Sequence, residues 1–222
     1  LQLIQFLKAK ATAKLWDSCF SDEEFLINKL KSNYFDKDSY SSQVKESFLE
    51  EYNGAKNLEI PSTYEFRDLK GIPRDPKLMQ KLVAFRVQRD KRLLNLSGTG
   101  TGKTLSAILA VQVCKAQRVF ITCPNGVVES WKRALNNAYP DAIVHVKPSN
   151  WQINLVEGKT NIVIVNHERL QDRFSENLLE FCVNFQSEII VIDEIHQSKS
   201  RKEATTSQRR ELIREFIRIS SN

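Results

Sequence analysis

From about residue 77 onward, short apolar runs alternate with longer stretches in which apolar positions recur at helical spacing. The runs at 162–165 and 189–192 are apolar at every position and β-branched throughout. Such runs are typical of strands buried on both faces of a parallel sheet. Their alternation with helices predicts an α/β domain with a mainly parallel sheet and right-handed crossovers. The expected strands are 93–96, 118–122, 142–146, 161–165 and 188–192, and the expected helices are 77–88, 103–115, 127–138 and 176–185.

The first 75 residues have a mostly helical pattern and contain no motif of known chemistry. Ser21 is followed three positions later by Glu24 and then by an apolar run, which is the signature of a helix start. A second helix is expected near 42–52, and Asn53-Gly54 would end it. Proline and glycine at 61, 71, 73 and 76 then interrupt the pattern. We therefore expect a helical N-terminal extension over residues 1–75 and a second domain over 76–222.

The composition is that of an ordinary globular protein, and the cysteines indicate its cellular compartment. Hydrophobic residues make up 41% and charged residues 27%, and no run approaches the roughly 18 apolar residues of a membrane span. The four cysteines form no C-x-x-C pair, and the three histidines do not complete a metal-ligand set with them. We therefore expect reduced thiols in a reducing compartment, which is the cytoplasm, or the nucleus of a eukaryotic cell.

The formal net charge of +6 is unevenly distributed along the sequence. Residues 1–75 hold 11 Lys and Arg against 13 Asp and Glu, whereas residues 76–222 hold 22 against 14. A basic domain is compatible with a phosphate-backbone partner such as nucleic acid. Charge alone is equally compatible with a solvated basic surface.

The sharpest motif is Ser-Gly-Thr-Gly-Thr-Gly-Lys-Thr at 97–104, between an expected strand and an expected helix, which is typical of a phosphate loop. Glycines let the backbone N–H groups surround a phosphate, and the following helix adds the positive end of its dipole. Lys103 would reach the β- and γ-phosphates of ATP, and the Thr104 hydroxyl would bind Mg²⁺. The expected ATP-binding residues of the loop are Ser97, Gly98, Thr99, Gly100, Thr101, Gly102, Lys103 and Thr104.

A second motif lies 90 residues after Lys103, where the apolar run 189–192 ends in Asp193 and Glu194. In a phosphate-loop ATPase, such a strand end delivers an aspartate to the Mg²⁺ on the triphosphate, and the glutamate orients or deprotonates the attacking water. Neighbouring residues of an extended chain point apart, so the two carboxylates can serve different ligands. We expect Lys103, Asp193 and Glu194 to be catalytic, with Thr104 and Asp193 as the Mg²⁺ ligands.

The sequence Asp-Glu-Ile-His at 193–196 resembles the D-E-x-H box of superfamily-two helicases and translocases. These are two-lobed motors with a RecA-like fold in each lobe, and the resemblance covers about residues 76–222. It implies an ATP-hydrolysing RecA-like lobe in which His196 couples the nucleotide site to the nucleic-acid site as part of the catalytic set. The family often relaxes the first glycine of the phosphate loop, where this chain has Ser97. Gln80 stands 23 residues before Lys103 and resembles the family's glutamine that reads the adenine ring.

Two further stretches resemble the family's segments that contact nucleic acid. Residues 120–124 with Trp131 resemble motif Ia, and residues 165–170 resemble motif Ib. Translocases of this class follow mainly the phosphate backbone, so the resemblance implies a nucleic-acid partner, with double-stranded DNA as the expected one. An aromatic residue at the start of an amphipathic helix is more often a core residue, so that interpretation of Trp131 stays open. The implied contacts are Pro124, Asn125, Trp131, Asn166, His167 and Arg169.

The subfamily is open between Swi/Snf-type, restriction-enzyme-type and phage-type motors, and the box also resembles the DEAD/DEAH-like group. Trp131 and the basic stretch 196–200 resemble Swi/Snf-type translocases, although residues 198–200 differ from that family's I-K-N. However, Ile195 replaces their alanine, and the phosphate loop differs from their usual M-G-L-G-K-T. The sequence also leaves open a phosphate-loop enzyme of another class, such as a kinase or an ATPase acting on protein or RNA, and a non-hydrolysing nucleotide-binding module.

The family also has a third motif and a second RecA-like lobe, whose arginine fingers are worth roughly 10³–10⁵ in rate in related phosphoryl transfer. Only 28 residues follow Glu194, so we expect the second lobe in the remainder of a longer polypeptide or in another chain. The family places the strand of the third motif between those carrying Lys103 and Asp193, and here it would lie at 216–221 or beyond. Without it the sheet would have a gap at its centre. We therefore expect weak ATP binding and slow turnover by this chain alone.

Overall fold

The computed structural model describes residues 2–98, 100–170, 175–194, 214–215 and 218. The chain divides into two compact units. Unit 1 comprises Leu1–Glu59 and Pro76–Leu96, and unit 2 comprises Ile60–Asp75 and Ser97–Asn222. None of the helices in the described part of the chain has the length and apolar character needed to span a bilayer.

Unit 2 is built on a four-stranded sheet in the order β2-β3-β1-β4, in which every strand pair is parallel. In β1, Phe120 lies level with Val163 of β3 and with Ile190 of β4. Each strand coincides with an expected apolar run, so the α/β class with a parallel sheet is confirmed. The strands are β1 (Arg118–Cys123), β2 (Ile143–Val146), β3 (Asn161–Asn166) and β4 (Ile189–Ile192).

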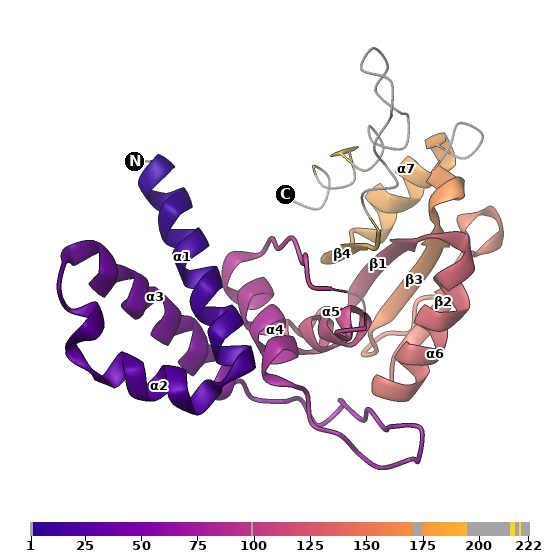
Figure 1. Ribbon diagram of the computed structural model, residues 1–222. Helices are drawn as coiled ribbons and strands as arrows, with labels where there is room; N and C mark the ends of the chain where they lie inside the picture. Colours follow the sequence, from indigo (N-terminus) through magenta and orange to yellow (C-terminus); the bar gives the residue numbers. More distant parts are fainter. Residues whose placement is uncertain (1, 99, 171–174, 195–213, 216–217, 219–222) are drawn as a thin grey trace. The chain divides into compact units, whose positions relative to one another are not determined.

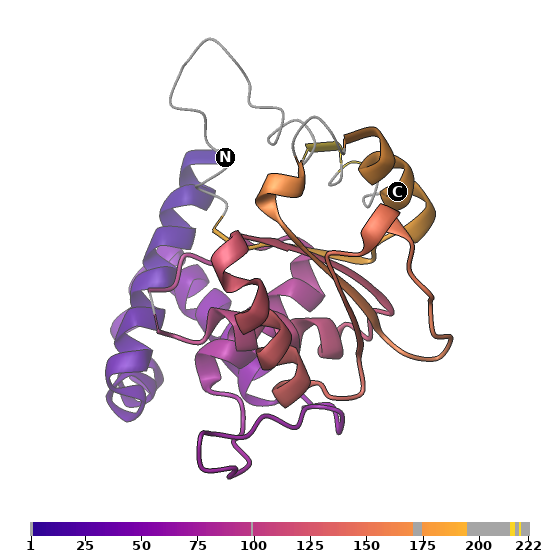
Figure 2. The same cartoon turned by 90° about the vertical axis from the view of Figure 1, so that its right-hand side faces the viewer.

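Helices cover both faces of this sheet (Figure 1). Helices α5 and α6 pack on one face, whereas α7 packs on the other. The view turned by 90° shows the same layers (Figure 2). The three helices are α5 (Lys103–Val113), α6 (Val128–Ala138) and α7 (Ser175–Phe185).

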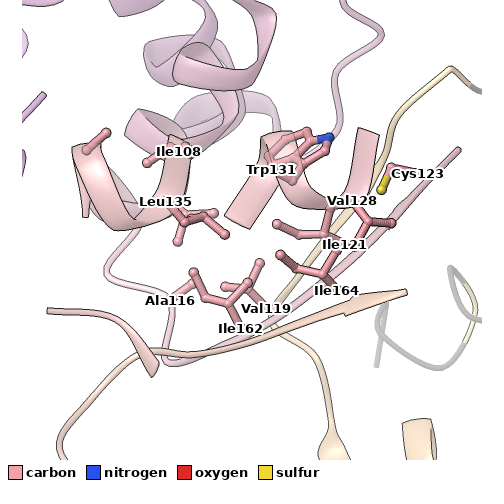
Figure 3. Packing of buried hydrophobic residues seen from close by; sticks show 12 residues of the cluster. Ile108, Ala116, Val119, Ile121, Cys123, Val128, Trp131, Leu135, Ile162 and Ile164 are labelled. Carbon is pink, nitrogen blue, oxygen red and sulfur yellow. The ribbon is translucent and has the colours of Figure 1, made fainter. Parts of the chain in front are cut away.

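Alternate residues of each strand enter the two cores. In β1, Val119 and Ile121 join the cluster under α5 and α6, whereas Phe120 joins the cluster under α7. Figure 3 shows the first cluster, in which Ile121 and Ile164 of the sheet lie beneath α6. Because both faces are covered, the strands need apolar residues at consecutive positions, which is the pattern that predicted them.

Residues 93–96 do not form the expected strand, so that prediction was wrong. Residues 92–98 have no regular secondary structure, and Leu94 and Leu96 are 62% and 82% exposed. An apolar run forms a strand only where a neighbouring strand supplies hydrogen-bond partners. Among the described strands, β4 pairs with β1 alone. The segment 216–221, which was expected to extend the sheet, lies outside the described residues apart from Arg218.

Unit 1 consists of helices, as the pattern of its sequence predicts. The helix start near Ser21 is confirmed with a shift of one residue, because Asp22 is the N-cap of α2 and its carboxylate accepts the Phe25 N–H at 2.9 Å. The helices are α1 (Gln2–Ser21), α2 (Glu23–Lys31), α3 (Ser39–Lys56) and α4 (Leu78–Asp90), with a 3₁₀ helix at Asn33–Phe35.

The expected helix end at Asn53-Gly54 is wrong, because α3 continues to Lys56. A Cβ atom at Gly54 would lie 2.3 Å from the ring of Phe85 in α4. The glycine therefore permits close packing of α3 on α4, even though glycine weakens a helix. The sequence shows Gly54 but not the Phe85 ring that packs against it. A glycine that ends a helix and a glycine that permits close packing therefore cannot be distinguished from the sequence.

A buried carboxylate joins three helices of unit 1. Glu51 of α3 accepts the indole N–H of Trp16 in α1 at 2.8 Å and hydrogen bonds from Arg86 and Arg89 of α4. Burial opposes the ionisation of Glu51, but the hydrogen bonds from Arg86 and Trp16 outweigh it and hold the pKa of Glu51 below its usual value. The helices are thus connected by a charged contact as well as by apolar packing.

The segment 60–75 packs in unit 2, whereas α4 belongs to unit 1. The Thr63 hydroxyl donates to Gln112 of α5 at 2.8 Å, and the Glu65 N–H donates to the Ala138 carbonyl of α6 at 3.1 Å. This division differs from the expected boundary between residues 75 and 76. Unit 1 holds 14 Lys and Arg against 11 Asp and Glu, and unit 2 holds 19 against 16. Each unit therefore carries a formal charge of +3, and the uneven charge along the sequence does not distinguish the units.

Candidate nucleotide-binding site

The loop before α5 has a backbone that only glycine adopts readily. Gly100 and Gly102 have φ angles of 75° and 85°, in the left-handed region. Gly102 is the N-cap of α5, so the helix begins at Lys103 directly after the loop. The first N–H groups of a helix have no acceptor within it, which makes this end suited to an anion.

The Lys103 side chain lies over its own loop. Its Nζ donates to the carbonyl oxygens of Ser97 and Gly98 at 2.9 and 3.2 Å. The Thr101 hydroxyl donates to the same Gly98 carbonyl at 2.8 Å. These neutral acceptors hold the ammonium group at the loop, where a phosphate would replace them with a stronger, charge-assisted contact.

Asp193 follows β4 directly and is held by three other elements. Its N–H donates to the Thr122 carbonyl of β1 at 2.9 Å. Its carbonyl oxygen and Nε2 of His167 are 2.8 Å apart, and His167 begins the 3₁₀ helix η4 (His167–Leu170) after β3. Its carboxylate Oδ2 accepts the indole N–H of Trp131 in α6 at 2.8 Å. Contacts from β1, η4 and α6 therefore place this residue.

The tautomer of His167 follows from its two partners. Nε2 faces the Asp193 carbonyl oxygen, which can only accept, so Nε2 carries the proton. Nδ1 then accepts the hydroxyl hydrogen of Thr122 at 2.9 Å. A buried chain of hydrogen bonds thus links β1 to Asp193.

Strand alternation places the Asp193 side chain on the face covered by α5 and α6. Ile189 and Val191 pack against the cluster beneath these helices, and Asp193 continues the alternation. Its hydrogen bond to Trp131 of α6 agrees with this placement. The helix that the phosphate loop opens and the acidic strand end therefore share one face of the sheet.

Glu194 has an unusual backbone, with a φ of 51°. A left-handed conformation is uncommon for a residue other than glycine, and such residues cluster at functional sites. Asp193 and Glu194 form a turn directly after β4.

Comparison with known proteins decides the family of this chain. The sequence matches the family described as type III restriction enzyme, res subunit, over residues 39–219. The chain belongs to this family. It is also 26% identical over 157 residues to the SWI/SNF-related matrix-associated actin-dependent regulator of chromatin subfamily A-like protein 1 homolog of Caenorhabditis elegans. That match covers 65% of this chain and 22% of the length of the relative.

The two matches confirm the resemblance to a superfamily-two helicase lobe of RecA-like, Swi/Snf-like type. They also agree with a restriction-type motor, since the res-subunit family carries that description.

Two of the expected nucleic-acid contacts, Trp131 and His167, are almost fully buried in this res-subunit lobe. Trp131 and His167 are 3% and 1% exposed, and both side chains contact Asp193. Neither side chain is accessible to a nucleic-acid backbone in this structure, so Trp131 is a core residue. Pro124 is half-buried and Asn125 is exposed, and both lie where β1 ends.

Of the other two expected contacts, Asn166 is the buried last residue of β3, and Arg169 lies in η4. Asn166 donates to the Glu168 carboxylate at 2.6 Å. The Arg169 guanidinium lies over the Trp151 ring, 4.6 Å from its centroid, and donates to the Pro148 carbonyl at 3.1 Å. Partial burial lowers the pKa of Arg169.

Two residues at this edge, Lys147 and Thr122, were not predicted from the sequence. Lys147 follows β2 with a φ of 44°, and its Nζ donates to Asn125 at 2.5 Å. Thr122 connects to His167. Lys147 belongs to no motif, and its only signal was its position just after an expected strand. Thr122 lies within the stretch that resembles motif Ia, but it was not among the residues expected to form contacts.

Three predicted site residues, Gln80, Thr99 and His196, are not part of the site as the structure describes it. Gln80 is buried in unit 1, where its Oε1 accepts the Lys77 N–H at 2.9 Å at the start of α4. This contact caps the helix, and a role in reading adenine stays a prediction. Thr99 and His196 lie outside the described residues.

The cysteines carry free thiols, as expected. Cys123 is buried at the end of β1, and burial together with the Asp193 charge raises the pKa of Cys123 to about 12. This thiol is therefore neutral and acts as a small apolar side chain.

Proposed function

We propose that this chain is the ATP-binding and hydrolysing lobe of a DNA-dependent helicase or translocase. The observation that carries the proposal is the shared face of the sheet. Helix α5, which begins at the phosphate loop, and the Asp193 end of β4 lie on the same side. Ligands of parallel α/β sheets bind at the carboxyl ends of the strands, and Asp193 stands at such an end.

Each proposed role follows from the chemistry of the residue. Lys103 and the first N–H groups of α5 bind the β- and γ-phosphates of ATP. The Thr104 hydroxyl and the Asp193 carboxylate are hard oxygen donors, which is the ligand type that Mg²⁺ prefers. When bound, Mg²⁺ offsets the charge that develops on the phosphate oxygens. Glu194 orients the attacking water and accepts its proton.

The proposed DNA contacts lie at the carboxyl ends of β1, β2 and β3. They approach the phosphate backbone through small polar and basic groups, which carry affinity without reading bases. The relative from C. elegans is named as a regulator of chromatin, which favours DNA over RNA as the partner. The proposed contacts are Pro124, Asn125, Lys147, Asn166 and Arg169.

The proposal includes a second RecA-like lobe, in the remainder of the polypeptide or in another chain. The chain spans 22% of the length of the relative, so the relative has ample sequence for such a lobe. In related phosphoryl transfer, an arginine supplied from outside the nucleotide-binding fold is worth roughly 10³–10⁵ in rate.

The test is ATP turnover by the full-length protein with and without duplex DNA. Glu194→Gln removes the proposed base while keeping the size of the side chain. Glu188→Gln is the matched control, because Glu188 precedes β4 at its opposite end and makes a partly exposed contact with Arg118 at 3.4 Å.

We expect DNA to stimulate turnover, Glu194→Gln to abolish it, and Glu188→Gln to leave it unchanged. Turnover that is indifferent to duplex DNA but stimulated by RNA or protein would favour a different partner. Undetectable turnover under every condition would contradict the proposal and favour a non-hydrolysing module.

A further inference from the structure

We propose that Trp131 is a positioning residue for Asp193: its indole N–H holds one carboxylate oxygen so that the other is presented to the metal of bound nucleotide. The inference rests on the proposed function, because it takes Asp193 as the Mg²⁺ ligand. It concerns a side chain that sequence resemblance had placed among the nucleic-acid contacts.

The backbone of Asp193 is already fixed at two points. Its N–H donates to Thr122 in β1, and its carbonyl oxygen accepts from His167. With the backbone held, the side chain can still rotate about its χ1 and χ2 torsions. The bond from Trp131 Nε1 to Oδ2, at 2.8 Å, restricts that rotation.

Trp131 is itself rigid enough to serve this purpose. It is 3% exposed and packs with Val128 and Ile121 in the hydrophobic cluster between α6 and the sheet (Figure 3). Its ring nitrogen is directed toward the end of the sheet where Cys123 lies, the end at which β1 stops. Metal-binding sites depend on such supporting contacts, since a loosely held ligand loses affinity and activity.

An indole N–H is a fitting donor for a metal ligand. It is neutral and can only donate, so it orients the carboxylate without cancelling its charge. A lysine or arginine in this place would form an ion pair with Asp193 and compete with the cation. Oδ2 is engaged by the indole, which leaves Oδ1 as the oxygen for Mg²⁺ or for one of its water ligands.

A purely structural role for Trp131 would need the ring but not the N–H. The chain offers an internal comparison in Trp151, which is 6% exposed and packs in the opposite core. Among the described residues, Trp151 Nε1 has no hydrogen-bond acceptor. Replacing each tryptophan by phenylalanine therefore removes a buried indole in both cases, but removes a contact with Asp193 in only one.

The experiment compares Trp131→Phe, Trp151→Phe and Asp193→Asn in the full-length protein. ATP turnover is measured as Mg²⁺ is titrated, and thermal unfolding is measured in parallel. We expect Trp131→Phe to raise the Mg²⁺ concentration at half-maximal rate or to lower kcat, by about 10–100-fold in combination. We expect Trp151→Phe to keep the wild-type Mg²⁺ dependence while its unfolding temperature falls by a similar amount.

A Trp131→Phe protein with the Mg²⁺ dependence of Trp151→Phe would overturn the inference. If Trp131→Phe does not fold, benzothienylalanine at position 131 keeps the bicyclic shape and removes only the N–H. Asp193→Asn separates the two proposals: if it retains full turnover, the metal role of Asp193 fails. If it is inactive while the position 131 variants behave as wild type, only the positioning role fails.

Discussion

At the scale of single residues, the phosphate loop depends on two left-handed glycines. Gly100 has a φ of 75°, and an alanine there would cost roughly 1–2 kcal/mol of backbone strain. We expect Gly100→Ala to weaken ATP binding by roughly 5–30-fold, since about 1.4 kcal/mol is a factor of ten. The measurement is a binding titration with a fluorescent ATP analogue.

Gly126 provides the control for this loop. It is outside the left-handed region, and a Cβ atom there would meet nothing within 4 Å. Gly126→Ala should therefore keep the wild-type affinity for ATP. Equal affinities of the Gly100 and Gly126 variants would show that the loop does not need its present conformation to bind nucleotide.

The sequence predicts contiguous motifs better than contacts between distant residues. The loop and the acidic pair are short motifs whose neighbours supply their context, so both could be found before the structure. The bond from Trp131 to Asp193 joins residues 62 positions apart. Only the fold brings them together, which is why Trp131 was grouped with nucleic-acid contacts.

At the scale of helices, the packing of α3 on α4 explains an internal glycine. An alanine at Gly54 would gain about 1 kcal/mol of helix propensity but would collide with the Phe85 ring, and overpacking typically costs 1–3 kcal/mol. We expect Gly54→Ala to lower the free energy of unfolding in the wild type. In a Phe85→Ala background we expect it to raise that free energy by about 1 kcal/mol.

Urea unfolding of the four proteins in this cycle tests the sign change. The decisive quantity is the coupling between positions 54 and 85 rather than either single effect. An equal stabilisation by Gly54→Ala in both backgrounds would mean that the ring does not constrain the glycine.

The Glu51 carboxylate makes the stability of unit 1 depend on pH. Its folded-state pKa is lowered, so its contribution is fully present above its ordinary value of 4.5 and is lost as the pH falls through the lower folded value. Glu51→Gln removes the carboxylate that pairs with Arg86, whereas Arg89 keeps the Asp90 carboxylate at 2.6 Å. Breaking a buried pair such as that of Glu51 with Arg86 costs about 3 kcal/mol. We expect this loss at pH 7, and we expect the difference from wild type to shrink below pH 4.5.

Glu50→Gln is the matched control for this pair. The Glu50 side chain is 66% exposed and lies 3.6 Å from Arg89, so its loss should change stability by less than about 0.5 kcal/mol. Chemical unfolding between pH 3 and 7 provides both comparisons. A pH-independent cost of Glu51→Gln would contradict the charged contact.

Four of the five expected strands exist because local apolar runs were enough to specify them. The run at 93–96 is Leu-Leu-Asn-Leu, contains no β-branched residue and forms no strand. Strand formation also requires a pairing partner, which the run does not encode. The helices α4, α5, α6 and α7 were predicted from the sequence. The end of α3 was not, because it depends on packing against the Phe85 ring of α4.

At the scale of the whole molecule, charge does not identify the nucleic-acid surface, because both units carry +3. Position in the fold is more specific. Lys147 lies at the carboxyl end of β2, whereas Lys159 precedes β3 at the other end of the sheet and pairs with Asp141. We expect Lys147→Ala to weaken DNA binding and to reduce the slope of log K against log salt by about 1.

Lys159→Ala removes the same charge from the opposite end of the strands. It should leave both the affinity for DNA and the salt slope unchanged, as measured by fluorescence anisotropy with the full-length protein. Equal effects of the two substitutions would indicate that the affinity for DNA depends only on the net charge of the protein.

The proposed function requires the phosphate loop and the end of β4 to hold one ATP together with one metal ion. A crystal structure of the full-length protein with Mg²⁺ and a non-hydrolysable ATP analogue tests it most directly. We expect Lys103 at the β- and γ-phosphates, and one Mg²⁺ ligated by Thr104 and reached by Asp193 directly or through a single water. A triphosphate bound elsewhere, or a metal ion at the loop that Asp193 does not reach, would mean that the loop and the end of β4 do not form one nucleotide site.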